Sequence, residues 1–307
     1  MNHSMRKKNY VRVLLLISFI ILLTVACVKK TDVLASNYST DSPANQVNRA
    51  EPINEPKAST DRLEKLLAAA DWKAVEEARR MGSAALPIIR PFVKDKNETV
   101  RQIAVGCAGA IGDPQGADIL AAGLKDVSLG VQLGAARELA EKPYPAATDA
   151  VLELLNKKPE EVLTELLIKA AGNLPGAKTV ATLRPFLAGD DVIATQTIYA
   201  LAKLGDAAGR KALSAKLSAK LPRTRYEALE NLCYVNNSSF AATAKKLLFD
   251  KANALPIGLP NDPLNRRVAD QAVDSLVCLL KLQPPFETSQ SKVYTDREIA
   301  TIRNLVK

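Results

Sequence analysis

Apolar residues recur along most of the chain at the spacing of one helix face, and the whole pattern repeats. Its clearest copy runs from Val100 to Pro114, where apolar residues three and four apart are followed by glycine, aspartate and proline. That spacing places the apolar side chains on one side of a helix. We number the copies repeats one to seven. They start at Ala70, Val100, Val131, Leu163, Ile193, Thr224 and Val268, in steps of 30, 31, 32, 30, 31 and 44 residues.

The fifth, ninth and twelfth positions of the repeat form an almost continuous apolar face. They lie four and three residues apart, so they follow one another on the same side of a helix, which predicts their burial. The fifth position holds Ala74, Ala104, Ala135, Leu167, Thr197, Ala228 and Ala272. The ninth position holds Ala78, Ala108, Leu139, Ala171, Leu201, Leu232 and Leu276. At the twelfth position, Lys142 breaks the apolar pattern.

Turn residues separate this first helix of each repeat from a second one. Residues that favour the left-handed end of a helix follow several first helices, namely Gly82, Gly112, Gly205 and Asn236. Asp113 and Pro114 then match a helix N-cap followed by proline at the first helical position. Each repeat is therefore predicted to be two antiparallel helices with one apolar face, which is buried only when neighbouring repeats stack.

The repeat resembles HEAT repeats, specifically the short bacterial type that is also found in proteins related to phycobilin lyases. Val100 to Asp126 is the closest match, and the resemblance extends over residues 59–283. It implies an all-α fold, a right-handed α-solenoid (a HEAT-like or armadillo-type superhelix) of about seven helix pairs. It also implies a binding or scaffolding role, since members of the family mostly act as binding surfaces. We expect the concave side, lined by second helices, to carry the contacts.

The 44-residue step holds about 13 residues more than the usual period, and they fall within residues 250–266. Insertions in solenoids form loops that often belong to the binding face. The candidate contact residues in this loop are Asn253, Leu255, Pro256, Pro260, Asn261 and Pro263. A passive connecting loop is the alternative. Apolar residues at helical spacing between 299 and 306 predict a C-terminal helix that caps the stack.

The N-terminus has the pattern of an export signal. Residues 1–12 are basic and polar, and residues 13–26 form an uncharged run of 14 residues. A membrane-spanning helix needs roughly 20 residues, whereas the hydrophobic part of a signal peptide is shorter. The pattern therefore predicts a signal peptide over residues 1–26. A secreted chain and an uncleaved N-terminal anchor are the alternatives.

The end of this run, from Leu23 to Cys27, resembles the lipobox of bacterial lipoproteins. The resemblance implies cleavage after Ala26 and a diacylglycerol on the thiol of Cys27. Because buried acyl chains stabilise membrane binding by about 0.8 kcal/mol per CH₂, we expect a lipid-anchored chain in the bacterial cell envelope, on the periplasmic side and on the outer membrane if one is present. Residues 27–58 lack apolar periodicity and predict a disordered tether behind the lipidated cysteine, which leaves 59–307 as the repeat domain.

Charge and composition restrict the chemistry of the repeats. Four of the 42 basic residues precede the hydrophobic run, and the rest of the chain holds 38 basic and 33 acidic residues. This mild excess predicts no nucleic-acid partner. The single histidine, His3, also lies in the N-terminal segment, so the usual general base and the commonest metal ligand are missing from the repeats. We expect no catalytic residue, no metal and no cofactor.

Three cysteines and several arginines in the repeats invite a functional interpretation. Cys107 falls among small residues and is expected to be a packed thiol. Cys233 and Cys278 lie on the first helices of neighbouring repeats, so a disulfide between them is one possibility in an oxidising compartment. Arg101 and Arg225 stand near the start of first helices, where ion pairs within the repeat are favoured over a ladder of ligand-binding residues.

The sequence thus predicts a non-catalytic, protein-binding scaffold that a lipid displays on the outer side of a bacterial membrane. Its protein partner would bind the concave helix face or the 250–266 loop. Two alternatives remain open. One is a chromophore-lyase-like or other enzyme-accessory protein of the HEAT-repeat family, and the other is a structural subunit of an envelope complex.

Overall fold

The computed structural model describes residues 55–189, 191–254 and 266–306. The predicted signal peptide, Ala26, Cys27 and nearly all of the tether lie outside the described residues. So do five candidate residues of the insertion: Leu255, Pro256, Pro260, Asn261 and Pro263. The described residues form one unit with its own core, and none of its helices is both long and apolar enough to span a bilayer.

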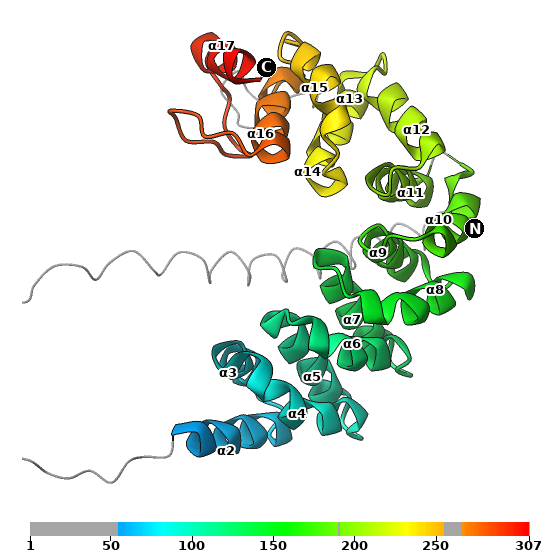
Figure 1. Cartoon of the computed structure of the whole chain (residues 1–307), viewed down its shortest axis with the longest axis vertical. Helices are drawn as coiled ribbons and strands as arrows, with labels where there is room; N and C mark the ends of the chain where they lie inside the picture. The colour runs from blue at the N-terminus through cyan, green and yellow to red at the C-terminus, as the bar shows by residue number, and fades with distance from the viewer. Residues whose placement is uncertain (1–54, 190, 255–265, 307) are drawn as a thin grey trace, which may run out of the picture. The chain divides into compact units, whose positions relative to one another are not determined.

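The all-α solenoid predicted from the sequence is confirmed. First helices pack against one another in chain order, and the second helices pack against the first helix of their own repeat, of the next repeat, or of both (Figure 1). The first helices are α3 (Lys73–Met81), α5 (Glu98–Ile111), α7 (Leu129–Glu141), α9 (Glu161–Ala171), α11 (Val192–Lys203), α13 (Pro222–Glu230) continued by α14 (Leu232–Val235), and α16 (Val268–Leu280). The second helices are α4 (Leu86–Ile89), α6 (Ala117–Leu124), α8 (Thr148–Asn156), α10 (Ala177–Leu183), α12 (Ala207–Leu217) and α15 (Ala241–Leu247).

Helix α2 (Glu55–Ala68) precedes repeat one and begins ahead of the predicted domain start at residue 59. The prediction placed residues 55–58 in the tether, and the structure corrects this boundary. Pro56 is the second residue of α2. A proline in the first turn of a helix is tolerated because its missing N–H has no partner there anyway. The proline in residues 55–58, which suggests a tether, is therefore compatible with the first turn of a helix.

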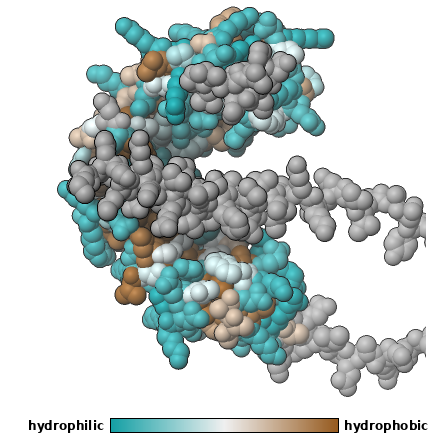
Figure 2. Space-filling model, turned by 180° about the vertical axis from the view of Figure 1, so that it is seen from behind, coloured by the Kyte–Doolittle hydropathy of each residue, from teal (hydrophilic) through white to brown (hydrophobic). Residues whose placement is uncertain are grey.

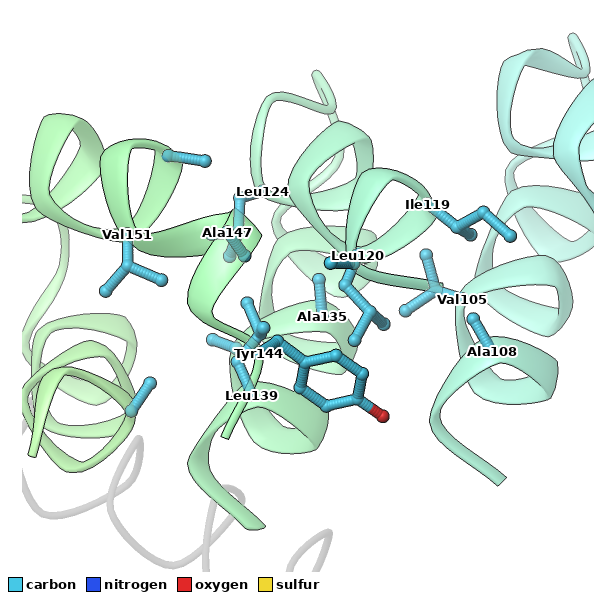
Figure 3. Packing of buried hydrophobic residues seen from close by; sticks show 14 of the residues in the cluster. Val105, Ala108, Ile119, Leu120, Leu124, Ala135, Leu139, Tyr144, Ala147 and Val151 are labelled. Carbon is cyan, nitrogen blue, oxygen red and sulfur yellow. The ribbon is translucent and has the colours of Figure 1, made fainter. Parts of the chain in front are cut away.

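The core consists of the apolar positions that the repeat pattern singled out. Every residue at the fifth position of the repeat is 0% exposed, and those at the ninth position are at most 2% exposed. In Figure 3, Val105 and Ala108 on α5 face Leu120 on α6 and Ala135 and Leu139 on α7. Stacking of neighbouring repeats therefore buries the face that a single helix pair would leave open.

Lys142, which breaks the apolar pattern at the twelfth position, lies outside the helix. Helix α7 ends at Glu141, and Lys142 is its extended C-cap, with φ −135° and ψ 149°. The following Pro143 disfavours the helical conformation at Lys142. The side chain is exposed, so the core is preserved because the helix is shorter, not because a lysine is buried.

Turn signals and repeat arginines also take their predicted places. Gly112 and Asn236 end α5 and α14 in the left-handed conformation, with φ of 70° and 47°. Arg101 binds Asp126 through Nε at 2.6 Å, and Arg225 binds Asp250 through Nε at 2.7 Å. Each arginine thus joins the start of a first helix to an aspartate shortly after the second helix of the same repeat. The prediction of ion pairs within the repeat is confirmed.

Buried polar contacts attach the capping helix α17 (Asp296–Leu305) to the last repeat. The guanidinium of Arg266 is almost fully buried and binds the carboxylate of Asp274, while its Nε donates to the carbonyl of Lys292 at 3.0 Å. The backbone N–H of Tyr294 donates to Asp270 at 2.9 Å. Arg266 is buried and Asp274 is mostly buried, and because the two are paired, neither is left as an isolated buried charge. Helix α17 thus lies in the segment for which the sequence predicts a cap, and it packs against α16.

Candidate binding site

Ion pairs between neighbouring repeats connect the second-helix side of the domain from repeat one to repeat five. Four such pairs occur among the described residues. They are Arg90–Asp118 at 2.7 Å, Lys125–Glu153 at 3.4 Å, Lys178–Asp149 at 2.5 Å and Arg184–Asp206 at 2.8 Å. In each pair a cation of one repeat faces a carboxylate of the next repeat or the preceding one. A carboxylate is therefore the usual partner of a cation on this side of the domain.

A shallow pocket lies where this series ends, between α12 of repeat five and α15 of repeat six. Its volume is about 310 Å³. It is lined by Ala207, Arg210, Lys211, Ser214, Ser239, Phe240 and Thr243. The buried ring of Phe240 and the methyl group of Ala207 supply apolar surface, two side chains supply positive charge, and three supply hydroxyl groups. This set can accept an anionic group and hydrogen-bond its oxygens.

The two cations of the pocket differ from the cations of the four ion pairs named above. No hydrogen bond or ion pair joins the side chain of Arg210 or Lys211 to another described residue, and both are exposed. Lys211 occupies the nineteenth position of its repeat, where repeats two and three carry Asp118 and Asp149. The charge at this position is thus reversed in repeat five, and the α15 side of the pocket offers hydroxyl groups in place of a carboxylate.

The helices around the pocket carry positive charge only. Their cations are Arg210, Lys211 and Lys216 on α12 and Lys245 and Lys246 on α15, and neither helix contains an acidic residue. Lys216 binds the hydroxyl of Thr195, and Lys245 binds the carbonyl of Val306, so these two cations already have partners. Figure 2 shows one face of the molecule, which is mainly hydrophilic, with hydrophobic residues single or in small groups. Charge, more than an apolar patch, distinguishes the α12–α15 surface.

Local sequence fixes α12 beside its neighbours. The carboxylate of Asp206 caps the helix by accepting from the N–H groups of Ala208 at 3.0 Å and Gly209 at 3.2 Å. The Arg184 guanidinium holds the pKa of this carboxyl below its ordinary value. A β-carbon at Gly209 would lie 2.5 Å from that of Leu201, so only glycine lets α12 approach α11 this closely. The start of α12 and its first two cations are thereby held in place.

The candidate loop from the sequence analysis does not contribute to this pocket through its described residues. Asn253 is exposed and pairs in antiparallel fashion with Arg267, and the N–H of Ala254 donates to the carbonyl of Arg266 at 3.1 Å. These contacts close the base of the insertion, whose remaining candidates lie outside the described residues. The pocket residues were not selected from the sequence, although residues 207–226 hold six basic and no acidic residues. This run of basic residues is the sequence feature that could have indicated the pocket.

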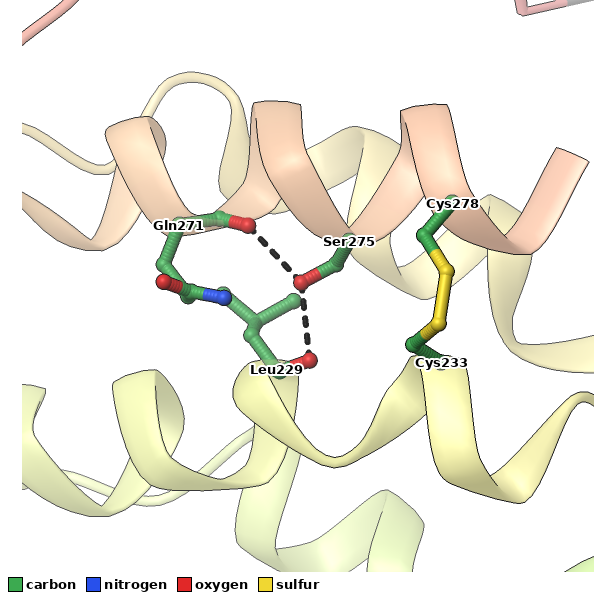
Figure 4. The surroundings of a disulfide bond; sticks show 5 residues. All are labelled: Leu229, Cys233, Gln271, Ser275 and Cys278. Atoms are coloured by element: carbon green, nitrogen blue, oxygen red, sulfur yellow. Dashed lines mark hydrogen bonds between the residues drawn. A yellow bond between two sulfur atoms is a disulfide. The ribbon is translucent and has the colours of Figure 1, made fainter. Parts of the chain in front are cut away.

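The structure joins Cys233 on α14 to Cys278 on α16 in a disulfide, across 45 residues of chain (Figure 4). Beside it, the hydroxyl of Ser275 lies 2.7 Å from the carbonyl oxygens of Leu229 and Gln271. The possible pairing suggested by the sequence is confirmed. Cys107 is fully buried as expected, and burial raises the pKa of its thiol to about 12. That thiol is therefore unreactive at neutral pH.

The described residues contain no group of three or more histidine, cysteine or acidic side chains arranged to hold a metal ion. No family model and no curated protein matches the sequence.

Solved structures do match the fold. The complex of CpcE and CpcF of phycocyanin lyase from Nostoc sp. PCC7120 is 17% identical, covers 88% of this chain and 100% of its own, and has a TM-score of 0.50. An archaeal HEAT-like repeat protein from Thermococcus onnurineus NA1 is 15% identical, covers 72% of this chain and 97% of its own, and has a TM-score of 0.42. At these identities the similarity shows the HEAT-like repeat fold and nothing finer.

Proposed function

We propose that the chain is a non-catalytic binding scaffold, which a lipid on Cys27 holds at the outer side of a bacterial membrane. The observation that carries the binding role is the pocket between α12 and α15, where Arg210 and Lys211 have no partner among the described residues. Two adjacent cations without counter-charge are disfavoured by mutual repulsion. A partner that supplies negative charge would relieve this repulsion, so the surface is suited to association.

The disulfide supports the export part of the proposal. Both Cys233 and Cys278 are exposed, so thiol reductants of the cytosol would reach the bond. Disulfides persist in the periplasm and outside the cell, and are rare in the reducing cytosol. The lipobox-like residues before Cys27 supply the same expectation independently, because lipoproteins of this type are exported before they are modified.

Anchoring is tested with Cys27→Ala, which removes the thiol that would carry the lipid. We expect wild-type protein in the membrane fraction with the mass of a cleaved, acylated chain, and the variant either released or left as an uncleaved precursor. Ser36→Ala, outside the lipobox-like segment, is the control and should behave as wild type. Unchanged mass and fractionation of Cys27→Ala would refute the lipid anchor.

Scaffolding is tested by chemical crosslinking in intact cells, followed by identification of the captured proteins. A specific partner should be recovered with the wild-type chain and lost with Arg210→Ala combined with Lys211→Ala. The matched control combines Lys65→Ala with Lys96→Ala, two exposed lysines whose side chains form no hydrogen bond or ion pair with another described residue. If the captured proteins are the same for all three chains, the pocket does not mediate the association. If the captured proteins and the wild-type chain remain together as one large assembly in detergent, the chain is better described as a structural subunit of an envelope complex.

A lyase-accessory role is the second candidate, and the likeness to the phycocyanin lyase complex is the observation that favours it. That likeness extends to the fold only. Incubation of the purified chain with a bilin chromophore and an acceptor protein would test it, with denaturing electrophoresis and visible absorbance as the readout. A coloured covalent adduct that depends on the chain would establish this role in place of the non-catalytic one.

A further inference from the structure

We propose that the pocket between α12 and α15 binds an acidic segment of a partner protein, whose carboxylate takes the place of the carboxylate missing at the junction of repeats five and six. The proposal deepens the binding role given above and rests on it for the identification of the occupant as a protein. Its content is chemical: Asp or Glu side chains bind Arg210 and Lys211.

The domain itself shows which group such a cation accepts. At the other second-helix junctions, the guanidinium or ammonium group of one repeat binds a carboxylate of its neighbour, as in Arg90–Asp118 and Lys178–Asp149. Repeat six has Ser239 and Thr243 beside the pocket instead of an acidic residue. The geometry of the fold therefore accommodates an Asp or Glu carboxylate on this side. At the junction of repeats five and six, a partner protein would supply that carboxylate.

The composition of the pocket fits a carboxylate at the end of a short apolar stem. Phe240 is one of the lining residues and is 3% exposed, and methylene groups of an Asp or Glu side chain can pack against it. The hydroxyls of Ser214, Ser239 and Thr243 can donate to carboxylate oxygens, and hydrogen bonds to an ionised acceptor are stronger than those between neutral groups. Cations and hydroxyl donors thus converge on one depression.

Exposed apolar residues follow both helices and extend the surface. Leu221 is 69% exposed beyond the end of α12, and Phe249 is 63% exposed beyond the end of α15. The guanidinium of Arg303 lies 4.7 Å from the ring centroid of Phe249. Protein interfaces commonly combine such apolar or aromatic anchors with charged contacts. An acidic segment that also carries apolar side chains can therefore contact the pocket and these two residues together.

The test measures fluorescence anisotropy of a labelled octaglutamate peptide with the full chain in phosphatidylcholine nanodiscs. We expect saturable binding at low salt that weakens as salt rises, because exposed charges are screened. Arg210→Ala combined with Lys211→Ala should lower the affinity by about tenfold or more, since both charge-assisted contacts are lost. The control, Lys65→Ala with Lys96→Ala, should stay within about twofold. Equal affinity of all three chains would overturn the proposal.

A second variant adds the missing carboxylate to the chain itself. Thr243→Glu places an acidic side chain at the pocket, where it can pair with Arg210 or Lys211 within the chain. We expect this variant to lose peptide binding and to unfold at a higher temperature than wild type. Thr243→Gln, of similar size and without charge, should keep most of the binding. If Thr243→Glu binds the peptide as wild type does, the carboxylate does not occupy this pocket.

Two further arms identify a different occupant. If nanodiscs that contain phosphatidylglycerol abolish peptide binding, lipid headgroups fill the pocket. If an oligonucleotide of equal charge binds more tightly than the peptide, with the same dependence on Arg210 and Lys211, the partner is a nucleic acid. Either result would overturn the commitment to a protein. The proposed function fails separately, through the fractionation of Cys27→Ala or the crosslinking, and its failure would leave peptide binding at the pocket unaffected.

Discussion

The hydroxyl of Tyr234 in repeat six donates a hydrogen bond to the main-chain carbonyl of Lys169 in repeat four, at 2.7 Å and across 65 residues of sequence. This contact joins repeats that are not neighbours. Lys203 of repeat five lies beside it, with its ammonium group 4.2 Å from the centroid of the Tyr234 ring. Lys203 in turn donates to Asn173 in repeat four at 2.7 Å. Three successive repeats are thus connected by more than nearest-neighbour packing, which is otherwise the rule in solenoids.

Removal of this hydroxyl should weaken the centre of the domain. Tyr234→Phe loses one partly buried hydrogen bond, and we expect the free energy of unfolding to fall by about 1 kcal/mol. Thermal or urea unfolding followed by circular dichroism would measure the change. An unfolding midpoint indistinguishable from that of wild type would mean that the contact between repeats four and six contributes nothing to stability.

Gly172 is required for the same contact. A β-carbon there would lie 2.0 Å from the Tyr234 hydroxyl and 3.1 Å from the Cα atom of Ala200. Gly172→Ala should therefore destabilise the domain by about 1–3 kcal/mol, the usual cost of overpacking. The matched control is Gly106→Ala, where the added β-carbon would meet only ordinary contacts at 3.6 Å. Because alanine favours helix, the control should be neutral or stabilising. Equal losses in both variants would contradict this explanation.

The disulfide between Cys233 and Cys278 should stabilise the last two repeats. Cys233→Ser combined with Cys278→Ser should lower the free energy of unfolding by about 2–4 kcal/mol, because the unfolded chain is no longer constrained. The measurement is thermal unfolding with and without dithiothreitol. The reductant should lower the midpoint of wild type and leave that of the double variant unchanged. A reductant effect of the same size in both proteins would exclude the disulfide as its cause.

Glu138 on α7 should make stability depend on pH. Burial raises the pKa of its carboxyl, and the nearby cations Arg137 and Lys142 only partly oppose this. The folded state therefore favours the protonated acid, and the associated stability is present below the ordinary pKa of 4.5 and lost as pH rises through the raised folded value.

Replacement of Glu138 by glutamine removes the loss of stability that accompanies ionisation of the Glu138 carboxyl. Glu138→Gln should raise the free energy of unfolding at pH 7 by up to about 1 kcal/mol, a figure already reduced for partial exposure. The gain should vanish at about pH 4, where the wild-type carboxyl is largely protonated as well. Melting temperatures at the two pH values measure it, with Glu64→Gln on the exposed side of α2 as the control. A gain that is the same at both pH values would exclude titration of Glu138 as the origin.

Two tyrosine hydroxyls should respond oppositely to removal. The hydroxyl of Tyr144 is buried, and it has no hydrogen-bond partner among the described residues (Figure 3). By contrast, the hydroxyl of Tyr294 donates to Asp274 at 2.5 Å and accepts from the N–H of Ser289 at 3.0 Å. Tyr144→Phe should be neutral or stabilise by up to about 1 kcal/mol, whereas Tyr294→Phe should cost about 1–3 kcal/mol. Urea unfolding of both variants decides this, and a larger loss for Tyr144→Phe would reveal a partner for its hydroxyl.

The sequence by itself determined the repeat, because burial in a solenoid follows local periodicity. Ala104 and Ala108 are fully buried since each stands on the apolar side of its own helix, and every repeat presents that side in the same way. Gly112 and Asn236 end helices for reasons that are local to the turn. The ion pair of Arg101 with Asp126 recurs at the same spacing in Arg225 and Asp250, so ion pairing within the repeat could be predicted, whereas the acidic partner was identified only in the structure.

Only the tertiary structure decided which side chains meet across repeats and which are left without a partner. Whether a cation on a second helix is neutralised depends on the residue that the adjacent repeat places beside it. Arg184 binds Asp206, whereas Arg210 shares a pocket with Ser239 and Thr243 of repeat six and has no carboxylate partner among the described residues. The contact between Tyr234 and Lys169 likewise depends on the distance between repeats four and six, which lie on either side of repeat five. Such pairings are set by distances between helices, which the period of apolar residues along the chain does not encode.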